Sequence, residues 1–319
     1  MTEYRDSLNQ RYWSYQEARF PAWDRFLDRP NAQDGRPPVF LPGEAWQNVI
    51  SDANATPQDA ARLLALVPEG ERHKWFRSMN SSQALAQSVL GNLSIHGLLG
   101  LLAELEADEG NPLLGNAQPS AETFAMEFKI DYLREPRPTS LDGYVSGNYR
   151  VAIECKFTEQ EVGSCSRPRL TREDSNYAAE HCDGTYTRQR ARKERCSLTE
   201  VGVSYWRHAP RLFQWPNDSD LTPCPLNKNY QLVRNVLAVG VNPDGTVSVD
   251  GGHAVLIYDE RNPAFRVGGS ADTSYTETQR ALREPAMLRR CSWQRIIQHI
   301  RHGGYLPWLT EQLALKYGL

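Results

Sequence analysis

A short apolar stretch of this sequence carries side chains whose types suit phosphodiester hydrolysis. From Arg150 to Thr158, period-two alternation places Glu154 and Lys156 on one face of a predicted strand. The strand predicted before it, 140–146, adds Asp142. Two carboxylates suit Mg²⁺ or Mn²⁺, because such cations take few protein oxygens and keep several waters. The metal would lower the pKa of the attacking water, and Lys156 would hold or polarise the nucleophile.

Two other interpretations of these charges stay open. Glu154 and Lys156 also fit a structural ion pair, although a hydrophobic strand does not bury two charges without a partner or a metal. A second Glu-x-Lys stands at Glu127 to Lys129, where a solvated polar face is expected. Glu127 remains open as an accessory metal ligand, because its strand should neighbour that of Asp142.

Asp142, an eleven-residue gap and Glu154-Cys155-Lys156 resemble the active-site signature of the PD-(D/E)XK nuclease superfamily. Leu141 stands where that signature has proline. The resemblance implies a restriction-endonuclease-like α/β core with a mixed central sheet flanked by helices, and a metal-dependent endonuclease acting on DNA. Within the superfamily, the stretches 138–142 and 230–235 and the cysteine-bearing insertion resemble uncharacterised bacterial restriction endonucleases.

Gln231 opens the helix predicted after that insertion, where several families of the superfamily place a glutamine near the active site. A polar residue in the first turn of a helix is an equally good interpretation.

The elements that must position these residues divide the chain into consecutive segments. Helical periodicity, capped by Ser81 or Ser82 and stopped at Gly110, predicts one long or kinked helix over 82–108. Alternation predicts strands over 124–133, 140–146 and 150–158. The predicted segments are a helical N-terminal region (1–110), core strands (111–158), an irregular basic insertion (159–228), a core helix and strands (229–275), and a helical C-terminal region (276–319).

The turn after 140–146 constrains the chemistry, because a one-residue slip turns every side chain to the other face of a sheet. A two-residue loop at Gly147 and Asn148 would put Asp142 and Glu154 on opposite faces. We therefore expect an odd-length loop with Gly147 at positive φ, or a bulge, with Asp142 and Glu154 as diagonal neighbours.

The predicted insertion carries four of the six cysteines of the chain: Cys165, Cys182, Cys196 and Cys224. A zinc ion or an iron–sulfur cluster would explain how a segment without a hydrophobic pattern stays folded. Their spacings include no short chelating pair, so ordinary buried thiols are the alternative. Cys155 and Cys291 are interpreted as packing residues, the second on a helix.

Basic residues gather in the insertion and again near the C-terminus. Residues 186–211 hold seven Lys and Arg against two Glu, and residues 279–302 hold six Arg against one Glu. Phosphate contacts and solvated faces with local carboxylate partners are both consistent with these runs. Tyr186, Trp206 and Trp215 could stack on bases or form a small core. The predicted DNA-binding residues are Arg188, Arg190, Arg192, Lys193 and Arg195.

Composition limits the class of protein. A net charge of -3 gives no global signal for nucleic acid, and no apolar run is long enough to cross a membrane. The first thirty residues carry charges throughout, so we expect no signal peptide and a cytoplasmic location. DNA is the expected partner, and a homodimer is left open. The rival functions are a nucleic-acid-binding protein that does not cut and a nuclease for RNA or structured DNA.

Overall fold

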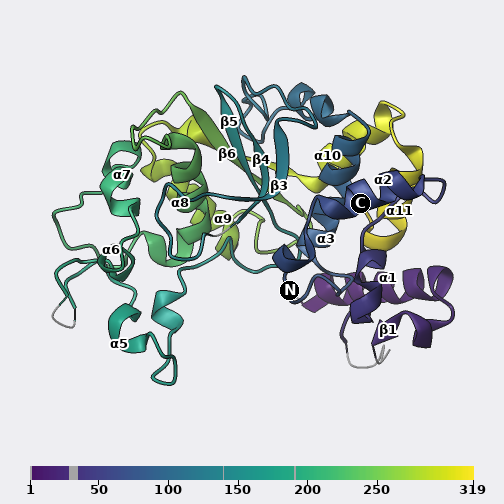
Figure 1. Ribbon diagram of the computed structural model, residues 1–319, viewed down its shortest axis with the longest axis horizontal. Coiled ribbons are helices and arrows are strands. Elements are labelled where there is room, and N and C mark those ends of the chain that lie inside the picture. The colour runs from purple at the N-terminus through teal and green to yellow at the C-terminus, as the bar shows by residue number, and fades with distance from the viewer. Residues whose placement is uncertain (1, 29–34, 139, 190–191) are drawn as a thin grey trace.

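A computed structural model describes residues 2–28, 35–138, 140–189 and 192–319 of the chain (Figure 1). Thr139 and Arg190, on which the sequence analysis drew, lie outside the described residues. Within the described part, a five-stranded sheet has the order β3-β4-β5-β6-β7. The first three strands form an antiparallel meander, and β6 and β7 run parallel to β5. This mixed sheet, flanked by helices, confirms the predicted α/β class. The bounds are β3 (Phe124–Lys129), β4 (Ser140–Val145), β5 (Arg150–Cys155), β6 (Gly252–Tyr258) and β7 (Leu288–Ser292).

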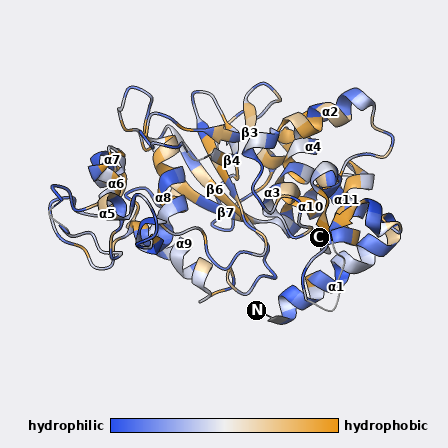
Figure 2. Cartoon of the chain, turned by 60° about the horizontal axis from the view of Figure 1, so that its bottom comes forward, coloured by the Kyte–Doolittle hydropathy of each residue, from blue (hydrophilic) through white to orange (hydrophobic). Residues whose placement is uncertain are grey.

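Helices cover both faces of the sheet (Figure 1). Against one face pack α7 (Tyr205–Leu212), α8 (Leu226–Gly240) and α9 (Ser270–Ala281). On the other side lie α3 (Ser82–Ala86), α4 (Asn92–Ile95), α10 (Trp293–His302) and α11 (Pro307–Tyr317), and α1 (Thr2–Arg19) packs on α11. Apolar residues concentrate where these layers meet (Figure 2). None of the described helices is both long enough and apolar enough to cross a bilayer. The remaining elements are β1 (Leu27–Asp28), β2 (Val39–Phe40), α2 (Pro57–Ala65), α5 (Tyr177–Glu180) and α6 (Ser197–Glu200).

The two faces of β5 follow the alternation expected from the sequence. Val151, Ile153 and Cys155 belong to the core under α3 and α10. Ala152 belongs to the core under α8. Every residue of β5 is buried, which explains why its polar side chains need specific partners.

Five residues lie between the paired residues Val145 and Val151, an odd number as predicted, and Gly147 has φ 140°. Val145 pairs with Val151, whereas the diagonal arrangement expected for Asp142 and Glu154 requires Val145 to pair with Tyr149. The register is therefore shifted by two residues. A shift of two keeps every side chain on its predicted face, because side chains alternate with a period of two.

The long helix predicted over 82–108 is shorter than expected. Ser81 caps it by accepting a hydrogen bond from the Ala84 N–H, as predicted. The helix then runs through a π-helical turn and ends at Ile95. Gly97, at φ 68°, takes the left-handed conformation that stops the helix, and a separate 3₁₀ helix follows over Leu99–Glu104.

The expectation for the C-terminal region was wrong. The C-terminal region is not helical throughout, because Leu288–Ser292 forms the edge strand β7 and carries Cys291. Arg289 and Arg290 interrupt the apolar sequence that would have predicted a buried strand. Arg290 pairs with Asp272 and Asp108 and stacks on Tyr275, and these tertiary partners allow a charged side chain in a strand. The insertion, predicted to be irregular, contains only short helices between β5 and α8, the longest described being α7 with eight residues.

Candidate active site

The β4–β5 pair brings two of the predicted carboxylates together. Gly143 pairs with Ile153, so continuing the register by one residue sets Asp142 directly opposite Glu154. Side chains of opposite residues lie on the same face of an antiparallel pair. Asp142 is further fixed by the backbone N–H of Cys155, which donates to its Oδ2 at 2.6 Å.

Lys156 and Glu154 form a buried ion pair. Nζ of Lys156 lies 2.7 Å from Oε1 of Glu154, and the side chains are 10% and 4% exposed. Burial alone would lower the pKa of Lys156, but Glu154, Glu159 and Asp142 outweigh it and raise that pKa. Burial alone would raise the pKa of Glu154, but Lys156 and Arg234 outweigh it and lower that pKa. Both groups therefore stay charged near neutral pH.

Helix α8 supplies a second layer of polar partners. Gln231 accepts a hydrogen bond from Lys156 Nζ at 2.8 Å. One turn later, Asn235 donates to Glu154 Oε2 at 2.9 Å, and Arg234 lies 3.8 Å from the same oxygen. Gln231 was expected from the sequence, whereas Asn235 and Arg234 were not. The signal was present, because polar residues at i, i+3 and i+4 of an apolar helix share one face.

Gln231 also approaches the chain that precedes α8. A Cβ on Gly163 would lie 1.8 Å from Gln231 Oε1, and Gly163 has φ 112°. Only glycine fits this close approach.

Glu127, the accessory candidate, reaches the same region from β3. It has φ 49° and interrupts the β3–β4 ladder. Gln83 of α3 donates to its Oε1 at 2.5 Å, and the Ser140 hydroxyl donates to its other oxygen. Burial raises the pKa of Glu127, and the nearby Glu154 adds to this effect. Gln83 was not found from the sequence, since no local pattern links it to β3.

Crowding of carboxylates gives the site its electrostatic character. Burial raises the pKa of Asp142 well above its usual range, and Glu154 and Glu127 raise it further. Lys156 offsets only part of this repulsion. Such a donor set fits a divalent cation, which would replace mutual repulsion by shared attraction.

The described residues contain no group of three or more His, Cys, Asp or Glu arranged to hold a metal ion by themselves. Magnesium does not need such a group. It is commonly held by one or two protein carboxylates and keeps several waters. Two carboxylates such as those of Asp142 and Glu154 would therefore be enough to hold it.

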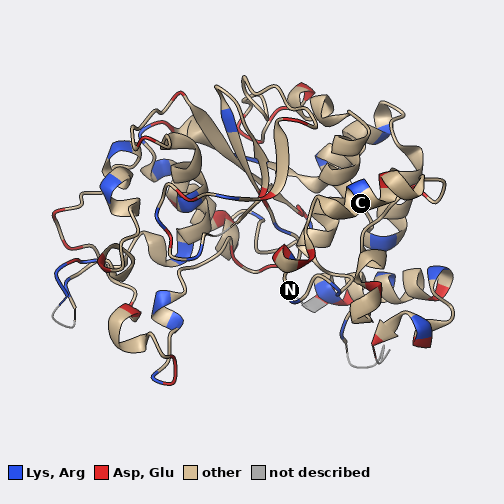
Figure 3. Cartoon of the chain, viewed as in Figure 1, with Lys and Arg blue, Asp and Glu red and all other residues tan. Residues whose placement is uncertain are grey.

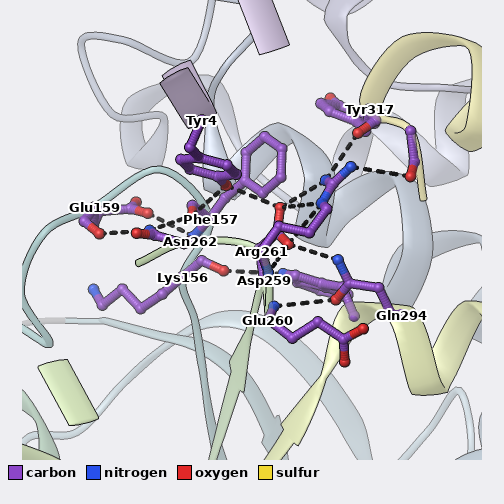
Figure 4. Close-up of polar contacts among 12 residues, drawn as sticks. Tyr4, Lys156, Phe157, Glu159, Asp259, Glu260, Arg261, Asn262, Gln294 and Tyr317 are labelled. Atoms are coloured by element: carbon purple, nitrogen blue, oxygen red, sulfur yellow. Dashed lines mark hydrogen bonds and ion pairs between the residues drawn. The ribbon is translucent and has the colours of Figure 1, made fainter. Parts of the chain in front are cut away.

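The chain that leaves β5 is held by three separate segments (Figure 4). Trp293 donates to the carbonyl of Lys156 at 3.0 Å, and Tyr4 and Asn262 donate to that of Phe157 at 3.1 and 2.8 Å. Tyr4 also donates to the fully buried Asp259. This bracing fixes the backbone from which the Lys156 side chain projects.

Glu159 links this exit to the start of α3. Its Oε2 accepts the Phe157 N–H, and its Oε1 accepts the Ser82 hydroxyl, both at 2.6 Å. Glu159 and Ser82 line a cavity of about 550 Å³ with Gln83 and Trp75. That volume is within the range of ligand sites, roughly 300–1,000 Å³. The indole of Trp75 is 58% exposed at its rim.

Comparison with known proteins then identifies the chain. Residues 28–318 match the model of a family described as Restriction Endonuclease associating with ARP. The chain belongs to this family. The match covers every strand of the central sheet, including those that carry Asp142 and Glu154. No curated protein and no solved structure matches the chain.

Lys and Arg residues are spread over many parts of the chain (Figure 3), and those predicted to bind DNA have unlike environments in this member of the restriction endonuclease family. Arg188 and Lys193 are exposed. Arg195 is engaged within the insertion, where it pairs with Asp220 at 2.7 Å. Arg192 is half-buried and donates to the Gln189 carbonyl at 3.1 Å. Arg190 lies outside the described residues.

The aromatic residues of the insertion stack on one another. The rings of Tyr186 and Trp206 are 3.6 Å apart and nearly parallel, and those of Phe213 and Trp215 are 4.3 Å apart. Tyr186 and Trp206 are buried. Of the two interpretations left open by the sequence, a small core agrees with these contacts.

Proposed function

We propose that this chain is a metal-dependent endonuclease that hydrolyses DNA phosphodiester bonds at a PD-(D/E)XK-type site. The observation that carries the proposal is the convergence of Asp142, Glu154 and Lys156 at the end of β5, where the Cys155 N–H binds Asp142 and Lys156 binds Glu154. Membership of a restriction endonuclease family supports it. A buried ion pair alone would not require a further carboxylate against it.

Asp142 and Glu154 would hold Mg²⁺ or Mn²⁺, with Glu127 as an accessory carboxylate. When bound, the ion would lower the pKa of the attacking water and neutralise charge on the phosphoryl oxygens. Asp142 would lose its proton as the ion binds, because a nearby dication lowers the pKa of a carboxyl.

Lys156 serves as a fixed cation in this proposal. Its raised pKa keeps the ammonium charged, so it does not act as a general base. Among the described residues, Glu154 and Gln231 accept two of its hydrogen bonds. An ammonium group has three N–H donors, so the third is left for an oxygen of the scissile phosphate. Gln231 is a positioning residue, because it acts through Lys156.

The DNA backbone would be held by the exposed cations of the insertion. Arg188 and Lys193 are the strongest candidates, because their side chains are accessible to a phosphate. Arg190 and Arg192 belong to the same run, and Arg195 would contribute only by giving up Asp220.

The test compares wild type with Asp142→Asn, which keeps the shape of the side chain and an acceptor for the Cys155 N–H. Asp131→Asn is the matched control, because Asp131 is exposed and lies just after β3. Each protein is incubated with supercoiled, linear and single-stranded DNA and with RNA, in Mg²⁺, Mn²⁺ or Ca²⁺. We expect wild type and the control to cut DNA, and Asp142→Asn to lose at least about 100-fold in rate.

The other outcomes decide among the rivals. Binding of DNA without cleavage in any metal would contradict the proposal and favour a non-cutting binding protein. Cleavage of RNA alone would change the proposed substrate from DNA to RNA and leave the assigned catalytic residues unchanged. Cleavage by Asp142→Asn at the wild-type rate would remove the site as assigned.

A further inference from the structure

The insertion between β5 and α8 has little regular structure to hold it together. Its described helices are short, the longest being α7 with eight residues. Four cysteines lie in it, and none of the six cysteines of the chain forms a disulfide. A metal ion bound by several of these thiols would be another kind of cross-link.

Backbone hydrogen bonds bring three of the cysteine segments together. The N–H of Cys165 donates to the carbonyl of Asn227, and the N–H of Cys224 donates to the carbonyl of Gly184, each at 2.8 Å. Asn227 in turn donates to the carbonyl of Cys224 at 2.9 Å. Gly184 is two residues from Cys182, so segments distant in the sequence meet at the thiols.

The four thiols are electrostatic neighbours. Burial raises the pKa of Cys165 to about 12, and a negative charge on Cys196 or Cys182 would raise it further. Burial also raises the pKa of Cys224, with contributions from Cys196, Cys165 and Cys182. Such a cluster ionises only when a cation compensates it.

Nearby backbone N–H groups favour the thiolate at three of these cysteines. The N–H of Arg167 lowers the pKa of Cys165, that of Leu226 lowers the pKa of Cys224, and those of Thr199 and Leu198 lower the pKa of Cys196, although burial outweighs them in each case. Hydrogen bonds of this kind favour the thiolate, which is the form that binds metals.

A side chain gives an independent indication. Trp206 is 4% exposed, and its Nε1 has no hydrogen-bond partner within standard limits among the described residues. The same indole lies beside Cys196 and favours its thiolate. A buried donor without an acceptor is costly, and a thiolate beside it would remove that cost.

We propose that Cys165, Cys182, Cys196 and Cys224 bind one structural Zn²⁺ ion as a tetrathiolate. Binding would release four protons to solvent and form four Zn–S bonds without any change of redox state. The four side chains must close around the ion, since no three ligands among the described residues already have metal-site geometry. The site would carry a net charge of 2−, and Arg167 lies close enough to Cys165 to offset part of it. This inference does not depend on the proposed nuclease activity.

The test is metal analysis of the full chain, purified without chelators. We expect about one zinc per chain in wild type, and loss of it in Cys182→Ser and in Cys196→Ser. Cys291→Ser is the matched control, because Cys291 is buried in β7, outside the insertion, and should retain the zinc. Cobalt substitution of wild type should give the intense visible bands of tetrahedral cobalt–thiolate coordination.

A second measurement keeps the test decisive if the serine variants fail to fold. Titration of wild type with a mercurial reagent should release zinc in step with four modified thiols, and trypsin should then cleave the insertion at its arginines. Protein without zinc, with freely reactive insertion thiols and a trypsin-resistant insertion, would overturn the proposal. Bound iron with visible absorbance, or a disulfide between these cysteines, would overturn it equally. Loss of cleavage with zinc retained would concern only the nuclease site.

Discussion

Replacing Lys156 by methionine should both destabilise the protein and abolish DNA cleavage. The substitution removes the ammonium 2.7 Å from Glu154 and leaves a carboxylate that is 4% exposed. Removing one partner of a buried ion pair costs about 3–5 kcal/mol of unfolding free energy. Asn235 and Arg234 still partner Glu154, so we expect the lower end, about 3 kcal/mol.

Neutralising the carboxylate should recover part of this loss. In the double variant Glu154→Gln/Lys156→Met the carboxylate that lost its ammonium is gone, and the amide oxygen can still accept from Asn235. Arg234 keeps its hydrogen bonds to the Ser140 carbonyl and to Asn235. We expect the double variant to be more stable than Lys156→Met, with a coupling energy of about 2 kcal/mol.

The control is a lysine with the same ion-pair distance and a different environment. Lys129 lies 2.6 Å from Glu71, but the two side chains are 51% and 31% exposed. Lys129→Met should therefore cost less than about 1 kcal/mol. Urea unfolding is measured in magnesium-free buffer without chelator, so that any metal in the insertion stays bound. Equal losses in Lys156→Met and Lys129→Met would show that burial does not set the cost.

Three further outcomes follow from the structure. Burial, together with the charge of Arg289, lowers the pKa of His253 to about 3. Below pH ~6.5 this histidine is therefore protonated in the unfolded state and still neutral in the folded state. Wild type should then lose up to about 1.4 kcal/mol of unfolding free energy for each pH unit of acidification. His253→Gln should flatten that loss in unfolding measurements between pH 7 and 4.5. Gly163→Ala should displace the Gln231 side chain and reduce cleavage as much as Gln231→Ala does, while DNA affinity in a filter-binding assay stays unchanged. Arg188→Ala/Lys193→Ala should weaken DNA binding and reduce the slope of log K against log salt by up to about 2, whereas an unchanged slope would show that neither cation contacts phosphate.

The sequence determined the face on which each catalytic candidate lies. Alternation along β5 is a property of the extended backbone itself, so Glu154 and Lys156 had to share one face and Ile153 the other. The same argument, applied to the hairpin, required an odd-length loop. These inferences succeeded because each depends only on neighbours along the chain.

Tertiary structure decided which other residues meet these side chains. The two-residue shift that sets Asp142 opposite Glu154 depends on how the loop closes under its packing contacts, since either register preserves the faces. Asn235 and Gln83 reach the site only because α8 and α3 dock on opposite sides of the sheet. Strand β7 was hidden for the same reason, because the carboxylates that accommodate Arg290 come from distant segments. Local pattern fixes the direction of a side chain, whereas long-range packing selects its partners, because the free energy of a buried charge depends on groups far away in the sequence.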